Sequence, residues 1–324
     1  MIGVYRAGQL LAGATVFSLV TLGQVGVAQA ESSDSAEATS TDSAETNGSA
    51  SRSCAPFVDF RSENFHRPTT IDNKYLPMVP GTRLTYRGTV SGGGQRVNHE
   101  VVFTVTDLVK DVAGVRNRVI YDVDKNDGEV TEAELAFFAQ DDKGIVWNLG
   151  EYPEEFEGGK FIGAPNVWIA GLEGASGGIH MLAAPEDHVG GREYLQGKAP
   201  KIDFLDCARV AAKNGTVDVP AGHFSDVLTT YERSPLESTT AIQTKEHAPG
   251  VGIVRIGAKN DPQAETLELI SAENLGQQAL SEVDAAASRL DEHGHEVSDV
   301  YRKTPELRRD GDGHVGQAVI GHDN

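Results

Sequence analysis

Asp122, Asp124 and Asn126, followed by Gly128 and Glu134, have the residue types of a calcium-binding loop. A helix-flanked calcium loop needs oxygen ligands at its first, third and fifth positions, glycine at the sixth and glutamate at the twelfth. Counted from Asp122, the glycine and the glutamate each come one position late, and the flanking runs alternate as strands do. The pattern favours a polar hairpin. Weak calcium binding by Asp122, Asp124 and Asn126 stays open as the metal hypothesis.

Ser176 lies in the string Gly-Ala-Ser-Gly-Gly, which resembles the turn that carries the nucleophile of many hydrolases. That turn needs a buried strand before the serine and a helix after it. Another glycine follows here, and no parallel-sheet pattern surrounds the string. Nothing in the sequence pairs His180 or His223 with Ser176 as a base. A hydrolase that uses Ser176 is therefore kept only as an alternative, and we assign no catalytic residue.

Four aromatic residues cluster around a glycine-rich, irregular stretch at 154–197: Trp147, Tyr152, Phe161 and Trp168. Aromatic side chains near the mouth of a sheet can line a cavity for a small molecule or a lipid. The alternative is that they belong to the core. We predict them as ligand-binding residues and expect no cofactor.

The two cysteines, Cys54 and Cys207, both lie in the part of the chain expected outside the cytoplasm. In an oxidising compartment such a pair predicts one disulfide, although two separate thiols remain the alternative. A bridge across a loop this long would stabilise the fold by roughly 4–5 kcal/mol in the chain-entropy model.

The N-terminus has the pattern of a secretory signal. Arg6 precedes an apolar run from Leu10 to Val27, and Ala28-Gln29-Ala30 supplies small residues for cleavage after Ala30. We therefore predict a signal peptide at 1–30 and a secreted or cell-envelope location in a bacterium. No cysteine follows the cut, so a lipid anchor there is not expected. No later apolar run approaches the roughly 18–20 residues that span a bilayer.

Residues 31–53 are rich in Ser, Thr, Ala, Asp and Glu and contain no large apolar side chain, which predicts a disordered acidic linker. The whole chain has 324 residues and a formal net charge of −20. So acidic a surface repels phosphate backbones, and nucleic acid is excluded as a partner.

From 54 to 271, short runs alternate between apolar and polar residues and are separated by Gly, Pro, Asn and Asp. Such runs predict antiparallel strands. Asn126-Asp127-Gly128 and Asn214-Gly215 have the composition of hairpin turns. We expect a mainly β fold, an antiparallel meander that forms a curved sheet or open barrel. Residues 272–324 are expected to form a short helix, with Leu280, Val283, Ala287 and Leu290 on one face, and then a disordered tail from 291.

Several phrases together resemble a broad group of exported bacterial proteins of unknown function that is common in actinobacteria. The phrases are 71–81 (IDNKYLPMVPG), 86–88 (YRG), 138–151 (FAQDDKGIVWNLGE), 217–228 (VDVPAGHFSDVL) and 247–252 (HAPGVG). The resemblance covers roughly 57–271 and implies an antiparallel β domain in the cell envelope or outside the cell. It carries over no catalytic motif, and the cysteines and the histidine-containing tail depart from it.

Together these features predict an exported, non-enzymatic binding module that holds an apolar or amphipathic ligand on the concave face of a curved sheet. Its partner would be a small apolar ligand or an envelope protein. The first alternative is a structural or protein-interaction module of the cell envelope, and the second is the hydrolase that uses Ser176.

Overall fold

The structure is a computed structural model that describes residues 53–92, 95–236, 241–260 and 265–311. Its strands are β1 (Thr82–Gly92), β2 (Gln95–Val112), β3 (Val115–Asn126), β4 (Glu129–Gln140), β5 (Val146–Glu157), β6 (Lys160–Gly163), β7 (Trp168–Ile169), β8 (Ser176–Met181), β9 (Tyr194–Ala199), β10 (Phe204–Val219), β11 (Gly222–Arg233), β12 (Ile242–Ala248), β13 (Gly252–Lys259), β14 (Thr266–Asn274) and β15 (Arg308–Arg309). The helices are α1 (Gln277–Val297) and the short 3₁₀ turns η1 (Ser62–Asn64), η2 (Pro185–His188), η3 (Pro200–Ile202) and η4 (Tyr301–Lys303).

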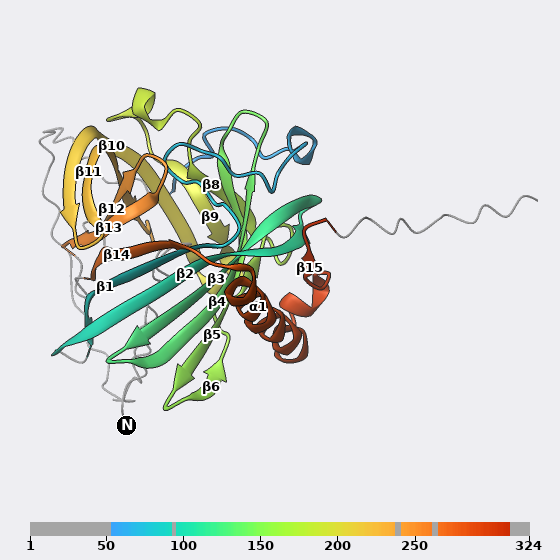
Figure 1. The fold of residues 1–324 in the computed structure, drawn as a ribbon. Coiled ribbons are helices and arrows are strands. Elements are labelled where there is room, and N and C mark those ends of the chain that lie inside the picture. The colour runs from blue at the N-terminus through green and yellow to red at the C-terminus, as the bar shows by residue number, and fades with distance from the viewer. Residues whose placement is uncertain (1–52, 93–94, 237–240, 261–264, 312–324) are drawn as a thin grey trace, which may run out of the picture.

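Twelve of these strands close into an antiparallel barrel, in the order β1-β14-β13-β12-β11-β10-β9-β8-β5-β4-β3-β2 (Figure 1). Closure occurs because β1 pairs with β14 on one side and with β2 on the other. β6 and β7 add to β5 outside this ring, and β15 adds to β2. The predicted antiparallel β meander with a C-terminal helix is confirmed, and the barrel is closed rather than open.

Backbone φ values and strand register confirm one of the two predicted hairpin turns and show that the other is not a turn. Asp127 and Gly128 have φ values of 48° and 88° between β3 and β4, as a tight hairpin requires. Asn214 has a φ of 58° but lies inside β10, where the register with β11 shifts on both sides of it. The Asn214-Gly215 pair is therefore an irregularity within one long strand and not a turn between two strands.

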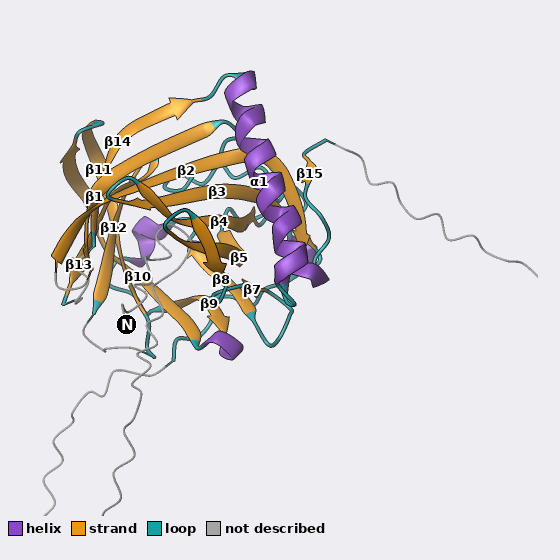
Figure 2. Ribbon diagram, turned by 90° about the horizontal axis from the view of Figure 1, so that it is seen from below, coloured by secondary structure: helices purple, strands orange, loops and turns teal. Residues whose placement is uncertain are grey.

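Helix α1 packs across the outside of the barrel, against β2 and β4 (Figure 2). Val283, Ala287 and Leu290 are buried there, as their helical spacing predicts. The chain then continues through η4 to β15, where Arg308 and Arg309 pair with β2. The expectation of a disordered tail from 291 is therefore wrong for residues 291–311.

Polar contacts hold residues 291–311 against the barrel. Because such contacts produce no hydrophobic periodicity, the sequence pattern did not reveal them. The ammonium of Lys110 lies 2.7 Å from Asp291 Oδ1 and donates to the carbonyl of Pro305 at 2.6 Å. Tyr301 donates its hydroxyl hydrogen to Asp291 at 2.6 Å, and its ring packs 4.2 Å from that of Tyr152.

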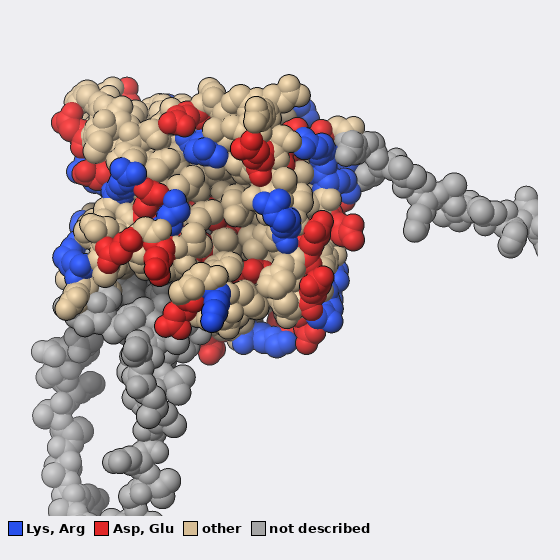
Figure 3. All heavy atoms as spheres, turned by 60° about the horizontal axis from the view of Figure 1, so that its bottom comes forward, with Lys and Arg blue, Asp and Glu red and all other residues tan. Residues whose placement is uncertain are grey.

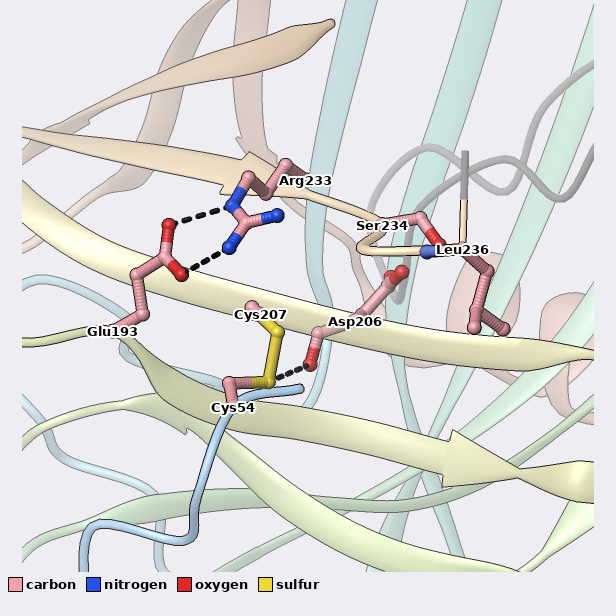
Figure 4. The surroundings of a disulfide bond; sticks show 7 residues. All are labelled: Cys54, Glu193, Asp206, Cys207, Arg233, Ser234 and Leu236. Carbon is pink, nitrogen blue, oxygen red and sulfur yellow. Dashed lines mark hydrogen bonds and ion pairs between the residues drawn. A yellow bond between two sulfur atoms is a disulfide. The ribbon is translucent and has the colours of Figure 1, made fainter. Parts of the chain in front are cut away.

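The predicted disulfide between Cys54 and Cys207 is present and joins residues 153 positions apart. It ties the N-terminal segment to β10 (Figure 4). Next to it, the Arg233 guanidinium binds both carboxylate oxygens of Glu193, at 2.7 and 2.5 Å. The disulfide attaches the first described residues to β10, and the Arg233–Glu193 ion pair attaches the residue before β9 to β11. Because Cys207 pairs with Arg233, both connections lie at the same place on these strands.

Replacing both cysteines, as Cys54→Ser with Cys207→Ser, is expected to lower the free energy of unfolding by about 3 kcal/mol. Measured losses usually fall below the chain-entropy figure for a loop of this length. Urea unfolding followed by circular dichroism would measure the change. A reducing agent should lower the stability of the natural chain but not that of the double variant. Equal stability of the natural chain and the double variant without a reducing agent would contradict the prediction.

The predicted signal peptide at 1–30 and residues 31–52 of the predicted linker lie outside the described residues. Within the part of the chain that is described, no helix is both long enough and apolar enough to cross a bilayer.

Candidate ligand site inside the barrel

The inner face of the barrel has one continuous apolar wall, formed by four neighbouring strands: β13, β14, β1 and β2. Register pairs such as Leu84 with Phe103 and Ile256 with Leu267 place their side chains on the same face. The residues of this wall are Leu84, Tyr86, Val101, Phe103, Val254, Ile256, Leu267 and Leu269, all buried.

The adjoining strands β3 and β4 put four carboxylates on the same inner face. Asp122 lies directly opposite Glu134, and Asp124 lies opposite Glu132. All four are at least nine-tenths buried. Like charges directly opposite one another destabilise an antiparallel pair, so this arrangement costs the fold stability.

Glu151 on β5 extends the acidic wall. It lies opposite Ala136, which shares the inner face with Glu134. Asn148 donates its amide hydrogen to Glu151 Oε1 at 2.6 Å, and the Trp168 indole donates to Oε2 at 2.9 Å. Two donors therefore hold this carboxylate in one orientation.

Burial keeps these acids from ionising in their usual range, because removing a carboxylate from water favours its neutral form. Burial raises the pKa of Asp122 to about 7 and that of Glu151 to about 7. For Asp124, Glu132 and Glu134, burial and then the neighbouring carboxylates raise the pKa well above its ordinary value.

His99 lies at the end of this wall and faces two acids. Its Nε2 is 3.3 Å from Glu265 Oε1 and 3.9 Å from Asp124 Oδ2, while its Nδ1 is 2.7 Å from Asn126 Oδ1. Burial alone would lower the pKa of His99, but Glu265 and Asp124 outweigh it and raise the pKa to about 9. His99 is therefore a cation at neutral pH.

A second polar group lies on β11 and β12. The Lys245 ammonium is 2.7 Å from Glu232 Oε2, and both side chains are buried. Burial opposes ionisation of Glu232, but Lys245 and His180 more than compensate and lower its pKa. Burial lowers the pKa of the adjacent His247 to about 4, so this histidine is neutral, and its Nε2 lies 3.2 Å from the Thr230 hydroxyl.

β9 carries two buried polar side chains without a partner in the described protein. These are the Tyr194 hydroxyl and both amide atoms of Gln196, in residues that are 1% and 3% exposed. Gln196 lies where the register of β9 with β10 is irregular, between the pairs Leu195–Cys207 and Gly197–Asp206. Tyr194 lies close enough to Glu232 for its pKa to respond to that charge. The backbone of Gln196 lies against Gly178, which pairs with Asn148.

The predicted metal trio is partly brought together. Asp122 and Asp124 share the inner wall, whereas Asn126 is engaged by His99. In the described ranges, no three His, Cys, Asp or Glu side chains converge as a metal-binding group. Calcium binding by Asp122, Asp124 and Asn126 stays a prediction.

The four predicted aromatic residues do not meet. Trp147 packs against Phe60 and Phe65, and Tyr152 packs beneath α1 against Tyr301. Phe161 is partly exposed beside His293. Trp168 stacks on Phe204 and lines a groove of about 260 Å³ beside the end of α1. Trp147 and Tyr152 belong to the covered outer face of β5, because they alternate with the inward side chains Asn148 and Glu151.

Ser176 does not occupy a nucleophile turn. It is the exposed first residue of β8 and pairs with Lys198 on β9. His180 is four residues further along the same extended strand, about 13 Å away. His223 is exposed on β11 beside Asp218. The structure thus brings neither histidine to Ser176.

The barrel has twelve strands, more than the eight that leave only enough room for side chains to fill. On the face that comes forward in Figure 3, the surface is recessed near its middle, and acidic atoms are visible within the recess. Around it, basic side chains are interspersed with acidic ones. The outside therefore presents no single-sign patch on this face.

The sequence analysis noted Glu134 only as part of the calcium-loop pattern, and it missed Glu132, Glu151, Gln196 and Lys245. A usable signal exists in residues 130–138, where glutamates alternate with Ala133 and Leu135. In an open sheet this alternation marks a face exposed to water. In this closed barrel, the glutamates face the interior, and α1 covers part of the opposite face.

No protein-family model and no curated protein matches the chain. The solved structures that match include two with low structural similarity. One is a protein from Bacteroides fragilis NCTC 9343, provisionally described as exported and with a YmcC-like fold, at 14% identity and a TM-score of 0.38. The other is a provisionally described lipoprotein from Parabacteroides distasonis ATCC 8503, at 15% identity and a TM-score of 0.32. Each match covers 62% of this chain and 99% of the other.

Proposed function

We propose that this protein is an exported, non-enzymatic binding module that holds an amphipathic ligand inside its barrel. The observation that carries the proposal is the division of the inner face. Strands β13, β14 and β1, and most of β2, present apolar side chains, whereas β3, β4, β5, β9, β11 and β12 carry buried polar ones among apolar ones such as Ile120 and Ala136. A molecule with an apolar chain and a polar head would satisfy both walls at once.

Unpaired polar groups support binding over a purely structural interior. Buried polar groups in folded proteins almost always have hydrogen-bond partners. The Gln196 amide and the Tyr194 hydroxyl have none within the described protein, so they offer donors and acceptors to a bound molecule.

An interaction module has less support. Closure of the barrel pairs both sides of each of its twelve strands, and the apolar stripe of α1 is used against the barrel itself. The export part of the proposal rests on the N-terminal pattern and on the Cys54–Cys207 disulfide, which requires oxidising conditions.

Binding of an alkyl chain in the barrel predicts an affinity that rises with chain length. Hexanol, octanol and decanol, titrated by calorimetry, should bind with successive gains of about tenfold, because each buried methylene contributes about 0.8 kcal/mol. Native mass spectrometry of protein purified from its own host would identify a co-purifying ligand. An affinity that does not change with chain length would contradict the proposal.

A pair of variants on β10 locates the binding. Ala208 is buried opposite Tyr194 and Glu232 on the inner face, whereas Ala212 is exposed further along the same strand. Ala208→Phe should fill part of the barrel and weaken decanol binding, and Ala212→Phe should leave it unchanged. Equal binding by the two variants would place the alkyl chain elsewhere.

A further inference from the structure

We propose that the groove beside the end of α1 is a second binding site, on the outside of the barrel, for a monocarboxylic acid with an apolar body. The inference goes beyond the proposed function, because the groove is formed by β7, η3 and the end of α1 and not by the inner wall. Figure 2 shows β7 beside that end of the helix. Two independent observations carry the inference: the lining of the groove and the charges at its rim.

The groove has room for a small molecule, and most of its lining is apolar. Its volume is about 260 Å³, whereas an apolar cavity of about 150 Å³ already holds benzene. Val297, the last residue of α1, is 42% exposed at the groove. The apolar lining also includes Val167, Trp168, Ile169 and Ile202. Covering such surface favours binding of an apolar body.

Trp168 gives the groove a fixed wall. Its ring stacks on Phe204, with the ring centroids 5.2 Å apart, and its indole N–H donates to Glu151 at 2.9 Å. Because these two contacts hold the ring in one orientation, binding against it costs little loss of side-chain freedom.

One carboxylate and two ammonium groups meet at the rim of the groove. Glu173, in the loop between β7 and β8, forms ion pairs with Lys201 on η3 and with Lys303 on η4, the second at 2.8 Å. The two lysines hold the pKa of Glu173 well below its ordinary value, at about 2, so its carboxylate is ionised at neutral pH. This group of three therefore has one unbalanced positive charge, and a ligand carboxylate would balance it.

The end of α1 does not cancel this excess. Arg302 donates to the carbonyl of Ser298 at 3.3 Å and lies 3.6 Å from Asp299, so the helix end and its nearby acid already have a cation. The side chain of Lys201 is 61% exposed. Because exposed ion pairs contribute little stability, Lys201 can turn from Glu173 to a ligand at small cost.

Calorimetric titration with octanoate at about pH 7 tests the inference. Lys201→Met should weaken octanoate binding about tenfold, since it removes a charged donor, and Lys201→Arg should restore it. Lys198→Met, an exposed change on β9 that does not line the groove, should leave the affinity as it is. Octanol has no charge to lose, so its binding should not respond to Lys201→Met.

Two phenylalanine variants distinguish the groove from the barrel. Ala164 lines the groove and is partly buried, so Ala164→Phe should fill part of it and weaken octanoate binding. Ala208→Phe, inside the barrel, should leave the binding that depends on Lys201 unchanged.

The inference is overturned if octanoate does not bind the natural chain or if Lys201→Met leaves its affinity unchanged. It is also overturned if Ala208→Phe weakens that binding and Ala164→Phe does not, because the carboxylate then lies in the barrel. Alkanol affinities that do not rise with chain length would contradict only the barrel proposal and would leave this outer site standing.

Discussion

Asp122→Asn combined with Glu134→Gln should raise the free energy of unfolding by about 4 kcal/mol at about pH 8 and by almost nothing near pH 4. The two acids lie opposite each other on the inner wall and are buried. Burial raises the pKa of Asp122 from 3.8 to about 7, and a shift of three units corresponds to about 4 kcal/mol. Neutral amides of the same shape remove that penalty.

The sign follows from proton uptake. Because the folded protein holds the Asp122 proton more tightly than the unfolded chain does, the natural protein is most stable below about pH 4 with respect to this group. That stability is lost as the pH rises towards about 7, where Asp122 ionises in the folded state. The Glu151 carboxyl, with its pKa also raised to about 7, acts in the same direction.

Urea unfolding at several pH values would measure this effect. The natural chain should lose stability between about pH 4 and pH 8, and the double variant should lose less. Glu129→Gln removes one exposed charge from β4 and should leave the pH dependence as it is. A double variant less stable than the natural chain at about pH 8 would show that the carboxylates are satisfied by contacts the variant removes.

The fold class could be predicted because each strand carries its own signal. Alternation in β2 and β3, with Asp127-Gly128 between β3 and β4, specifies antiparallel pairs locally. Closure could not be predicted in the same way. It depends on the pairing of β1 with β14, between residues almost 200 positions apart, and no local pattern encodes that contact.

The candidate site illustrates the same limit. Asp122, Asp124 and Glu134 were noted because they resemble a familiar loop, but Glu132 and Glu134 also have the alternation expected of a face exposed to water. That face of β3, β4 and β5 points into the interior only because the twelve strands close into a barrel. The aromatic residues Trp147 and Tyr152 lie on the covered outer face, away from the inner wall, and the sequence could not distinguish the two positions because a covered outer face is as apolar as an inner wall.

The C-terminal segment provides the second large expected effect. Asp291→Asn should lower the free energy of unfolding by about 3–5 kcal/mol, because it leaves the Lys110 ammonium buried without its counter-charge. The amide has only one oxygen, whereas Asp291 now accepts from the Tyr301 hydroxyl at Oδ1 (2.6 Å) and from the Leu307 N–H at Oδ2 (3.0 Å), so one of these two hydrogen bonds is lost as well. The larger part of the loss would come from the charge, and the rest from that hydrogen bond.

A double-mutant cycle distinguishes this charge effect from loss of packing. Adding Lys110→Met to Asp291→Asn should recover most of the lost stability, since removing both charges is far less costly than stranding one. Asp299→Asn, an exposed change in the same segment, should have almost no effect. Burial already lowers the pKa of Lys110, so the single Asp291→Asn variant should regain stability at alkaline pH as the amine loses its proton. A pH-independent loss that Lys110→Met does not relieve would mean that hydrogen bonds, and not charge, hold residues 291–311 on the barrel.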